Sequence, residues 1–291
     1  MGTRISIAIT VVVIVALGVV MAVSAAVIVP MNAGDTSRTY DVLFNSRGWL
    51  VLAAAALGLL AGAFTRRPTV RIEDGIVERH DGVAIFEHWL HVVAVLLLLG
   101  SGIALGFLFI PRLVTGAHNT GVALNLHWVG VVLFAFSGVY YATNTVLSGR
   151  LKEHLAGLED INVGIAHYRA QLAKSEPPAE GKFYASERIA YVYMLVALGL
   201  VALTGVVKLL AYGINMPAGL MGVVTPLHDV GALLVALFLI AHVLMGAVVP
   251  WSWPELRSMV TGKLPLEYVQ QHHKAWYDEL MGSPARSKEN Q

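Results

Sequence analysis

The chain has 291 residues, of which 56% are hydrophobic and only 13% charged, and its formal net charge is +1. Soluble proteins carry roughly 25% charged residues, so this composition, with a mean hydropathy of +0.67, excludes an ordinary soluble domain and indicates a membrane protein. The near-zero charge argues against a nucleic-acid-binding surface. The absence of cysteine excludes disulfides, thiolate metal sites, iron–sulfur clusters and covalent c-type haem.

Long apolar stretches predict an all-α integral membrane bundle, because a spanning helix needs about 20 mostly apolar residues. Six stretches qualify: 5–29, 48–64, 83–110, 122–147, 187–212 and 224–249. The first is longer than the apolar core of a signal peptide, so we expect a retained helix there. The second is short and rich in alanine.

The connecting segments predict the orientation of the bundle. Of the 20 Lys and Arg residues, sixteen lie on the side that holds both termini and the segments 65–82 and 148–186, and four lie on the other side. By the positive-inside rule, both termini are expected in the cytoplasm.

The cytoplasmic segment 148–186 is too long for a tight turn. Apolar residues recur at helical spacing over 158–174, which predicts a surface helix that ends before the sequence SEPPAEG at 175–181. We interpret it as a solvated linker helix, or alternatively as a docking site for a partner subunit. His154 and His167 are expected to be solvated.

Two histidines stand in the last predicted span, His228 and His242. Fourteen residues at 100° each sum to 1400°, within 40° of whole turns, so both lie on one face, about 21 Å apart along the axis. One intramembrane histidine is explained by a hydrogen bond to a neighbouring helix. Polar groups are costly in lipid, so two histidines on one face at opposite depths need the same functional explanation at each depth.

Two further histidines match these depths. His88 begins the third span and His127 the fourth, so depth pairs His88 with His242 and His127 with His228. Each pair suits bis-His ligation of a b-type haem, and the two pairs predict two stacked haems. His91 is an alternative to His88, as ligand or as propionate partner. Glycines that predict close approach of a macrocycle, or helix packing, are Gly100, Gly102, Gly130, Gly138 and Gly231.

Several motifs occur together in one order. They are HWLHVVAVLLLLGSG (88–102), HWVG (127–130), LVALTGVV (200–207), the His228–His242 pair and the tail TGKLPLEYVQQHHKAWYDEL (261–280). On these motifs, the chain from about 79 to 281 resembles the cytochrome b (gamma) subunit of respiratory formate dehydrogenases.

The resemblance implies a four-helix di-haem cytochrome b core over 68–260 and a cytoplasmic tail over 261–291. The pair of helices predicted within 1–67 is a departure from the family, because the minimal four-helix form lacks it. It assigns the outer haem to His127 and His228 and the inner haem to His88 and His242. His272 and His273 are not iron ligands in that family, and we expect them to pack over the inner haem pocket.

The resemblance also implies partners, in a bacterial or archaeal cell membrane. A molybdenum or tungsten catalytic subunit and an iron–sulfur subunit would deliver electrons at the outer face, and a quinone would accept them near the cytoplasmic face. The whole complex could form a higher oligomer.

One segment departs from the family pattern. Where the family has Lys-Tyr-Asn-Ala-Gly-Gln-Lys at its quinone pocket, this chain has KFYASER (182–188). Tyr184 could donate a hydrogen bond to a quinone carbonyl and Glu187 could pass protons. Equally, the segment could only cap the next helix, with Ser186 as the N-cap.

Other functions remain open at this point. Thiosulfate reductases and nickel–iron hydrogenases use related membrane anchors. A haem-free transporter or anchor would need acidic partners for its histidines, and the predicted spans offer chiefly Glu87 and Asp229. A self-contained ferric or ascorbate-linked haem reductase would need no partner subunit.

Overall fold

The computed structural model describes residues 42–66 and 69–282, and these form two compact units. The first consists of the described part of Met1–Arg67 with Phe86–Ser148 and Ala197–Leu237. The second consists of Gly149–Val196 with the described parts of Pro68–Ile85 and Phe238–Gln291. The predicted span 5–29 lies outside the described residues.

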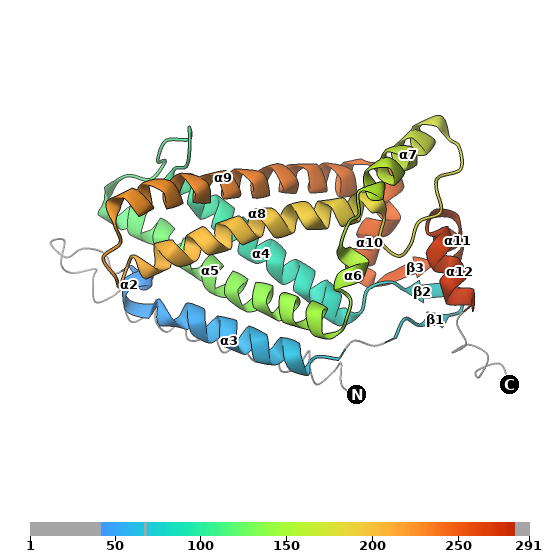
Figure 1. Ribbon diagram of the computed structural model, residues 1–291, viewed down its shortest axis with the longest axis horizontal. Coiled ribbons are helices and arrows are strands. Elements are labelled where there is room, and N and C mark those ends of the chain that lie inside the picture. The colour runs from blue at the N-terminus through green and yellow to red at the C-terminus, as the bar shows by residue number, and fades with distance from the viewer. Residues whose placement is uncertain (1–41, 67–68, 283–291) are drawn as a thin grey trace. The chain divides into compact units, whose positions relative to one another are not determined.

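Four long apolar helices confirm the predicted core (Figure 1). They are α4 (Gly82–Leu105), α5 (Gly116–Leu147), α8 (Ala185–Leu210) and α9 (Ala218–Val243), and α9 continues as a π-helical turn at Leu244–Val248. Each is long and apolar enough to cross a membrane. Large apolar side chains on them face outward, as Leu203 (72% exposed) and Leu237 (51% exposed) do, which is the surface that lipid requires.

The predicted span 48–64 forms a shorter helix than a spanning segment needs. After the short α2 (Leu43–Arg47), α3 (Trp49–Phe64) has 16 residues, about 24 Å against a hydrocarbon core of about 30 Å. It runs alongside α5 (Figure 1). Gly62 permits the close approach, because a Cβ there would lie 2.6 Å from the Tyr140 carbonyl oxygen. The Asn144 amide then donates to the Gly62 and Thr65 carbonyls at 3.2 and 2.8 Å.

The second unit contains a small sheet that the all-α expectation did not include. Strands β1 (Ile72–Glu73), β2 (Ile76–Glu78) and β3 (Lys263–Pro265) pair antiparallel in that order. Asp74 and Gly75 have positive φ angles of 49° and 73°, as a tight hairpin turn requires. Strands of two or three residues are too short to show an alternating pattern, although the Asp-Gly pair is a recognisable turn signal.

Short helices complete the second unit. The helix predicted over 158–174 is confirmed as α7 (Glu159–Ala173), which ends at Lys174 in the left-handed conformation. The other helices are α6 (Leu151–His154), a 3₁₀ turn at Pro250–Ser252, α10 (Trp253–Thr261), α11 (Leu266–His272) and α12 (Lys274–Gly282). Val77, Leu264, Val269 and Trp276 form the unit's apolar core, so the tail packs on the hairpin that precedes α4.

Candidate functional site

The first unit brings His127 of α5 and His228 of α9 together. Their ring centroids lie 6.5 Å apart and their planes are inclined by 63°. Sequence reasoning paired these two residues from depth alone, and the structure places them side by side.

Each of these imidazoles is held by a hydroxyl from a neighbouring helix. Nδ1 of His127 lies 2.9 Å from Ser101 Oγ of α4, and Nδ1 of His228 lies 2.9 Å from Thr204 Oγ1 of α8. The hydroxyls also bond to carbonyls one turn earlier in their own helices, Ser101 to Leu97 at 2.5 Å and Thr204 to Leu200 at 2.6 Å.

The surroundings of the two histidines repeat. Each lies in an H-x-V-G sequence, and the glycines Gly130 and Gly231 let the partner helix approach, because a Cβ there would meet Leu98 at 2.8 Å and Val201 at 2.7 Å. Helix packing is therefore the role of these two glycines. A glycine follows each hydroxyl residue and lies beside the imidazole. A Cβ added at Gly102 would lie 3.9 Å from His127 Cε1, and one added at Gly205 would lie 3.5 Å from His228 Cε1.

The spacing of the two rings matches that of two imidazoles on one metal ion. With a metal–nitrogen distance of about 2 Å, and about 1.1 Å from each nitrogen to its ring centre, two opposed imidazoles have centroids about 6.2 Å apart. The observed 6.5 Å agrees. Among the described residues, no cluster of three or more His, Asp and Glu side chains could hold a metal ion. Two imidazoles are a donor set that haem iron accepts.

Charged residues accompany this pair. Lys208, one turn after Thr204 on α8, interacts electrostatically with Asp229, the residue after His228. The Asp229 carboxylate also accepts a hydrogen bond of 3.3 Å from the Leu108 amide. The acid beside this proposed ligand is thus engaged by the protein itself.

His88 and His242 belong to different units, and their pairing stays a prediction. His88 lies on α4 with its ring edge-on to Trp89 at 5.3 Å. His242 lies on α9, directly before the π-helical turn, and stacks on Phe238 at 5.4 Å and 13°. π-helical turns inside helices occur frequently at functional sites.

His91 lies against the α5 face of the first unit. Its Nδ1 donates to the Glu87 carbonyl at 2.9 Å, and its ring meets Phe134 and Tyr141 edge-on at 6.2 and 6.0 Å. His91 is therefore explained by packing between aromatic rings of α5.

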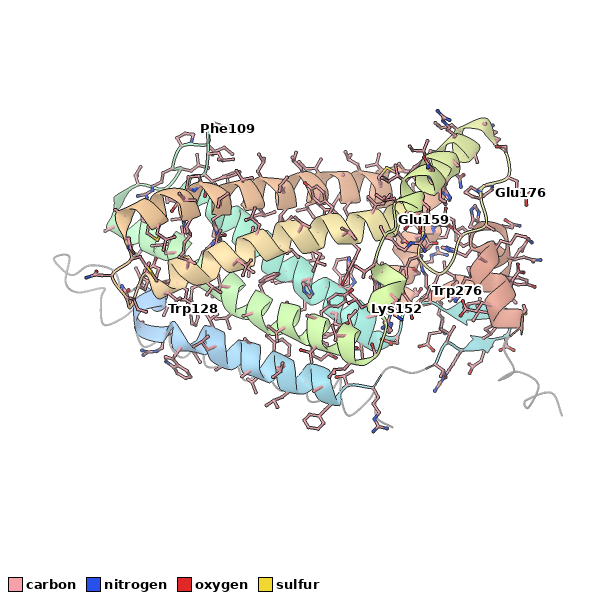
Figure 2. All side chains as sticks on the ribbon, viewed as in Figure 1. Phe109, Trp128, Lys152, Glu159, Glu176 and Trp276 are labelled. Atoms are coloured by element: carbon pink, nitrogen blue, oxygen red, sulfur yellow. The ribbon has the colours of Figure 1, made fainter. Side chains whose placement is uncertain are left out.

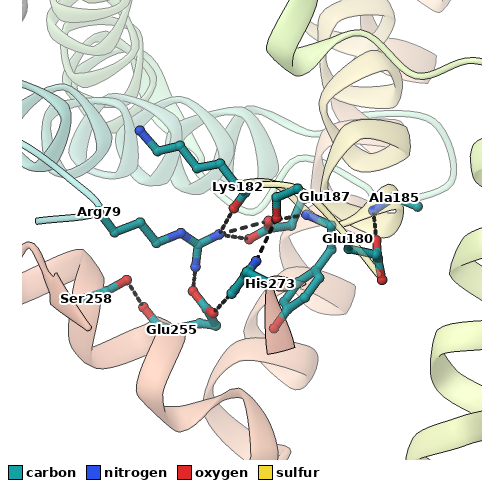
Figure 3. A network of polar contacts seen from close by, with 10 residues as sticks. Arg79, Glu180, Lys182, Ala185, Glu187, Glu255, Ser258 and His273 are labelled. Carbon is teal, nitrogen blue, oxygen red and sulfur yellow. Dashed lines mark hydrogen bonds and ion pairs between the residues drawn. The ribbon is translucent and has the colours of Figure 1, made fainter. Parts of the chain in front are cut away.

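The second unit contains a dense ionic network around Arg79 (Figure 3). The Arg79 guanidinium, with a side chain only 1% exposed, bonds to the Glu187 carboxylate at 2.9 Å and to the Lys182 carbonyl at 3.1 Å, and it pairs with Glu255. His273 is fully buried beside it, with Nδ1 2.8 Å from the Gly181 carbonyl and Nε2 2.8 Å from the Glu255 carboxylate. Since a carbonyl only accepts, Nδ1 carries hydrogen, and a further proton lies between Nε2 and the carboxylate.

Two further pairs extend this polar region. His167 is buried at 6% exposure, with Nδ1 2.7 Å from Glu180, so the expectation that it is solvated is wrong. The Arg188 side chain bonds to buried Asp160. Burial alone would raise the pKa of Asp160, but the hydrogen bond from Arg188 holds that pKa below its usual value. His154 rests on Tyr191 and Phe183 rather than in open solvent.

The segment 182–188 takes part in the same network. The Tyr184 carbonyl accepts the first bond of α8, from Arg188, and Glu187 returns to the Tyr184 amide at 2.8 Å. This is one half of a capping box, so Tyr184 occupies the N-cap position and Ser186 does not. The Tyr184 ring stacks on His273 at 4.3 Å. Burial, and then neighbouring Tyr268, raise the pKa of Tyr184, so its phenol stays a hydrogen-bond donor.

Comparison with known proteins adds two findings. A family model described as prokaryotic cytochrome b561 matches residues 79–262, a range that includes the four long helices and His88, His127, His228 and His242. The chain is also 30% identical, over 185 residues, to an Azospira oryzae protein whose name describes it as a proposed protein-methionine-sulfoxide reductase subunit, YedZ1. That similarity covers 60% of this chain and 91% of the relative. Both findings agree with a cytochrome b of the membrane, and neither names a formate dehydrogenase.

Proposed function

Because the chain belongs to the prokaryotic cytochrome b561 family, and is therefore a membrane electron-transfer protein that binds haem b, we propose that it connects a quinone to a partner oxidoreductase subunit through two b haems. The observation that carries this proposal is the His127–His228 pair. Its centroid distance of 6.5 Å and its two hydroxyl partners suit one iron between two imidazoles.

A b haem accepts and releases one electron at its iron. In this chain, His127 and His228 would hold the iron of one haem, and His88 and His242 would hold that of the other. In a membrane, the apolar helices that carry these histidines would keep water away from them and so limit the reorganisation that accompanies electron transfer. The abundance of Lys and Arg in 65–82 and 148–186 supports a cytoplasmic position for the second pair.

The quinone would bind at the segment 182–188. Tyr184 supports this placement, because its phenolic hydroxyl, beside Tyr268 at the start of α8, would donate its hydrogen to a quinone carbonyl. Glu187 is held by Arg79 and by the Tyr184 amide, so we assign it the task of fixing this segment in place.

The partner would be a catalytic subunit of the sulfoxide-reductase type, a choice supported by the relative that this chain matches over 91% of its length. Electrons would then run from quinol through the haems to the partner. A formate dehydrogenase-like partner, with an iron–sulfur subunit and a molybdenum or tungsten catalytic subunit, is the second candidate, and the tail motif at 261–280 favours it. In that case the electrons would run the other way.

A haem count tests the ligand assignment. The purified protein should contain two haems per polypeptide by pyridine haemochrome, and His127→Ala and His228→Ala should each reduce the count to about one. The matched control is His118→Ala, which removes an exposed histidine. A full haem count in both ligand variants would contradict the assignment.

A second experiment tests the partner. The complex is purified through this chain, its subunits are identified, and the haem spectrum is followed after substrate is added. We expect methionine sulfoxide to oxidise the reduced haems. Reduction of the oxidised haems by formate would favour the second candidate, and a lack of response to either, with no copurifying subunit, would contradict the proposed partner.

A further inference from the structure

We propose that Ser101 and Thr204 are matched positioning residues that fix the ring orientation and tautomer of His127 and His228 and thereby set the redox potential of the iron between them. This inference rests on the proposed function, since it requires that the two imidazoles ligate a haem.

The hydroxyl hydrogens of Ser101 and Thr204 are both engaged within their own helices. Each hydroxyl donates to the carbonyl four residues earlier in its own helix, Ser101 to Leu97 and Thr204 to Leu200. A hydroxyl has one hydrogen to give. Once that hydrogen is engaged, the oxygen meets an imidazole 2.9 Å away only as an acceptor.

The tautomer follows from this acceptor. Nδ1 of both histidines must carry the hydrogen, which leaves the Nε2 lone pair of each ring for a metal. The Leu98 and Val201 carbonyls near these imidazoles are acceptors as well and favour the same tautomer. Both rings are therefore prepared as neutral Nε2 ligands before any metal binds.

The repetition separates this arrangement from accidental packing. Serine and threonine inside a helix commonly satisfy themselves on a carbonyl one turn back, so a single contact with a histidine would mean little. Here the contact occurs twice, at the same 2.9 Å, between residues 26 and 24 positions apart on different helices. In both cases a glycine follows the hydroxyl residue and another stands three residues after the histidine.

The consequence is electronic as well as steric. A hydrogen bond from Nδ1–H makes the imidazole a stronger electron donor, which favours the oxidised iron and lowers its midpoint potential. The two bonds also hold the ring planes at 63° to each other, and this angle determines the electron paramagnetic resonance signal of a low-spin ferric haem.

Isosteric substitution tests the proposal in the full-length protein. Thr204→Val keeps the side-chain shape and removes the hydroxyl that accepts from His228. Ser101→Ala removes the hydroxyl that accepts from His127. Each should raise the midpoint potential of one haem, shift its low-spin signal and accelerate haem transfer to apomyoglobin about tenfold, since outer-sphere partners of metal ligands typically contribute 10–100-fold to affinity. Ser101→Thr and Thr204→Ser should restore the parental values.

The control is Ser137→Ala on α5. Ser137 is fully buried, and its hydroxyl bonds to the Phe134 carbonyl of its own helix, so its removal should change none of the three measurements. If Thr204→Val and Ser101→Ala keep the parental midpoint potential and the parental low-spin signal, the inference is wrong. The ligand assignment, which rests on the haem count, would be unaffected. If Ser101→Ala fails to assemble, Thr204→Val decides alone. Failure of the proposed function would appear differently, as a full haem count in His127→Ala.

Discussion

His127 and His228 of the first unit differ from His273 of the second unit in how many ring nitrogens the protein itself engages. In the first unit, His127 and His228 are each held through Nδ1 by a hydroxyl. In the second unit, the protein engages both nitrogens of His273, one by the Gly181 carbonyl and the other by Glu255. A ring held at one nitrogen is oriented and still able to bind a metal, whereas a ring held at both has no lone pair to offer.

The charged residues show the same contrast. In the second unit, arginines, glutamates and histidines neutralise one another, as Arg79 does with Glu187 and Glu255. In Figure 2 the nitrogen and oxygen atoms are dense on α7 and the elements near Glu159 and Glu176, and sparse along α9. The network around Arg79 therefore holds the second unit together, whereas Ser101 and Thr204 of the first unit hold the rings of His127 and His228.

The largest effect should come from Arg79→Met, which tests whether the network is structural. The substitution leaves Glu255, with a side chain 14% exposed, without its cation. Breaking a buried ion pair by removing one partner costs about 3–5 kcal/mol, so thermal unfolding in detergent should shift down strongly. The haem that we assign to His127 and His228 should remain. Arg79→Lys keeps the positive charge but lacks the several N–H donors of the guanidinium, so its unfolding temperature should be intermediate. An unchanged unfolding curve for Arg79→Met would contradict the structural role.

The same substitution at two histidines sharpens the contrast. His273→Phe removes two buried hydrogen bonds and should lower the free energy of unfolding by about 1–3 kcal/mol while haem content stays at the parental value. His228→Phe should instead lose one haem per polypeptide. Thermal melts and haemochrome counts on both variants check the pair. Loss of haem from His273→Phe, or its retention in His228→Phe, would reverse the assignment.

The sequence predicted the features that local pattern determines. The lengths of the apolar runs predicted α4, α5, α8 and α9, and helix geometry predicted that His127 and His228 share a depth. The Ser101–His127 and Thr204–His228 bonds were missed because they join different helices, although their residues stand in the Ser-Gly and Thr-Gly sequences quoted as motifs. Two such sequences preceding an H-x-V-G sequence by 26 and 24 residues were the available signal.

The second unit was predicted poorly for a physical reason. Its core depends on contacts between distant segments, such as Arg79 with Glu255 and strand β2 with β3, and no local periodicity encodes them. His167 was expected in solvent because its helix is amphipathic and short. Burial is possible there because Glu180 meets its Nδ1, and a partner of that kind is visible only in three dimensions.

The smallest effect concerns Lys182 at the border of the network. Burial, and then the charge of Arg150, lower the pKa of the Lys182 ammonium to about 8, and its Nζ lies over the Phe183 and Trp276 rings at 5.6 and 5.8 Å. The folded protein therefore releases this proton at a lower pH than the unfolded chain, whose lysine pKa is about 10.4. Stability should accordingly rise between about pH 8 and pH 10, where the unfolded chain binds the extra proton.

Competitive acylation measures that proton directly. Near pH 8 about half of Lys182 is the free amine, so acetic anhydride should modify it faster than exposed Lys152 when the rates are compared per accessible amine by mass spectrometry. The advantage should shrink above pH 10, where ordinary lysines also lose their protons. In Arg150→Gln the pKa of Lys182 should rise, because a neighbouring positive charge is gone, and the labelling midpoint should move to higher pH. A Lys182 midpoint equal to that of Lys152 would mean that the second unit leaves this amine in water. The contrast between the ionic network around Arg79 and the apolar surroundings of His127 and His228 would then not extend to Lys182.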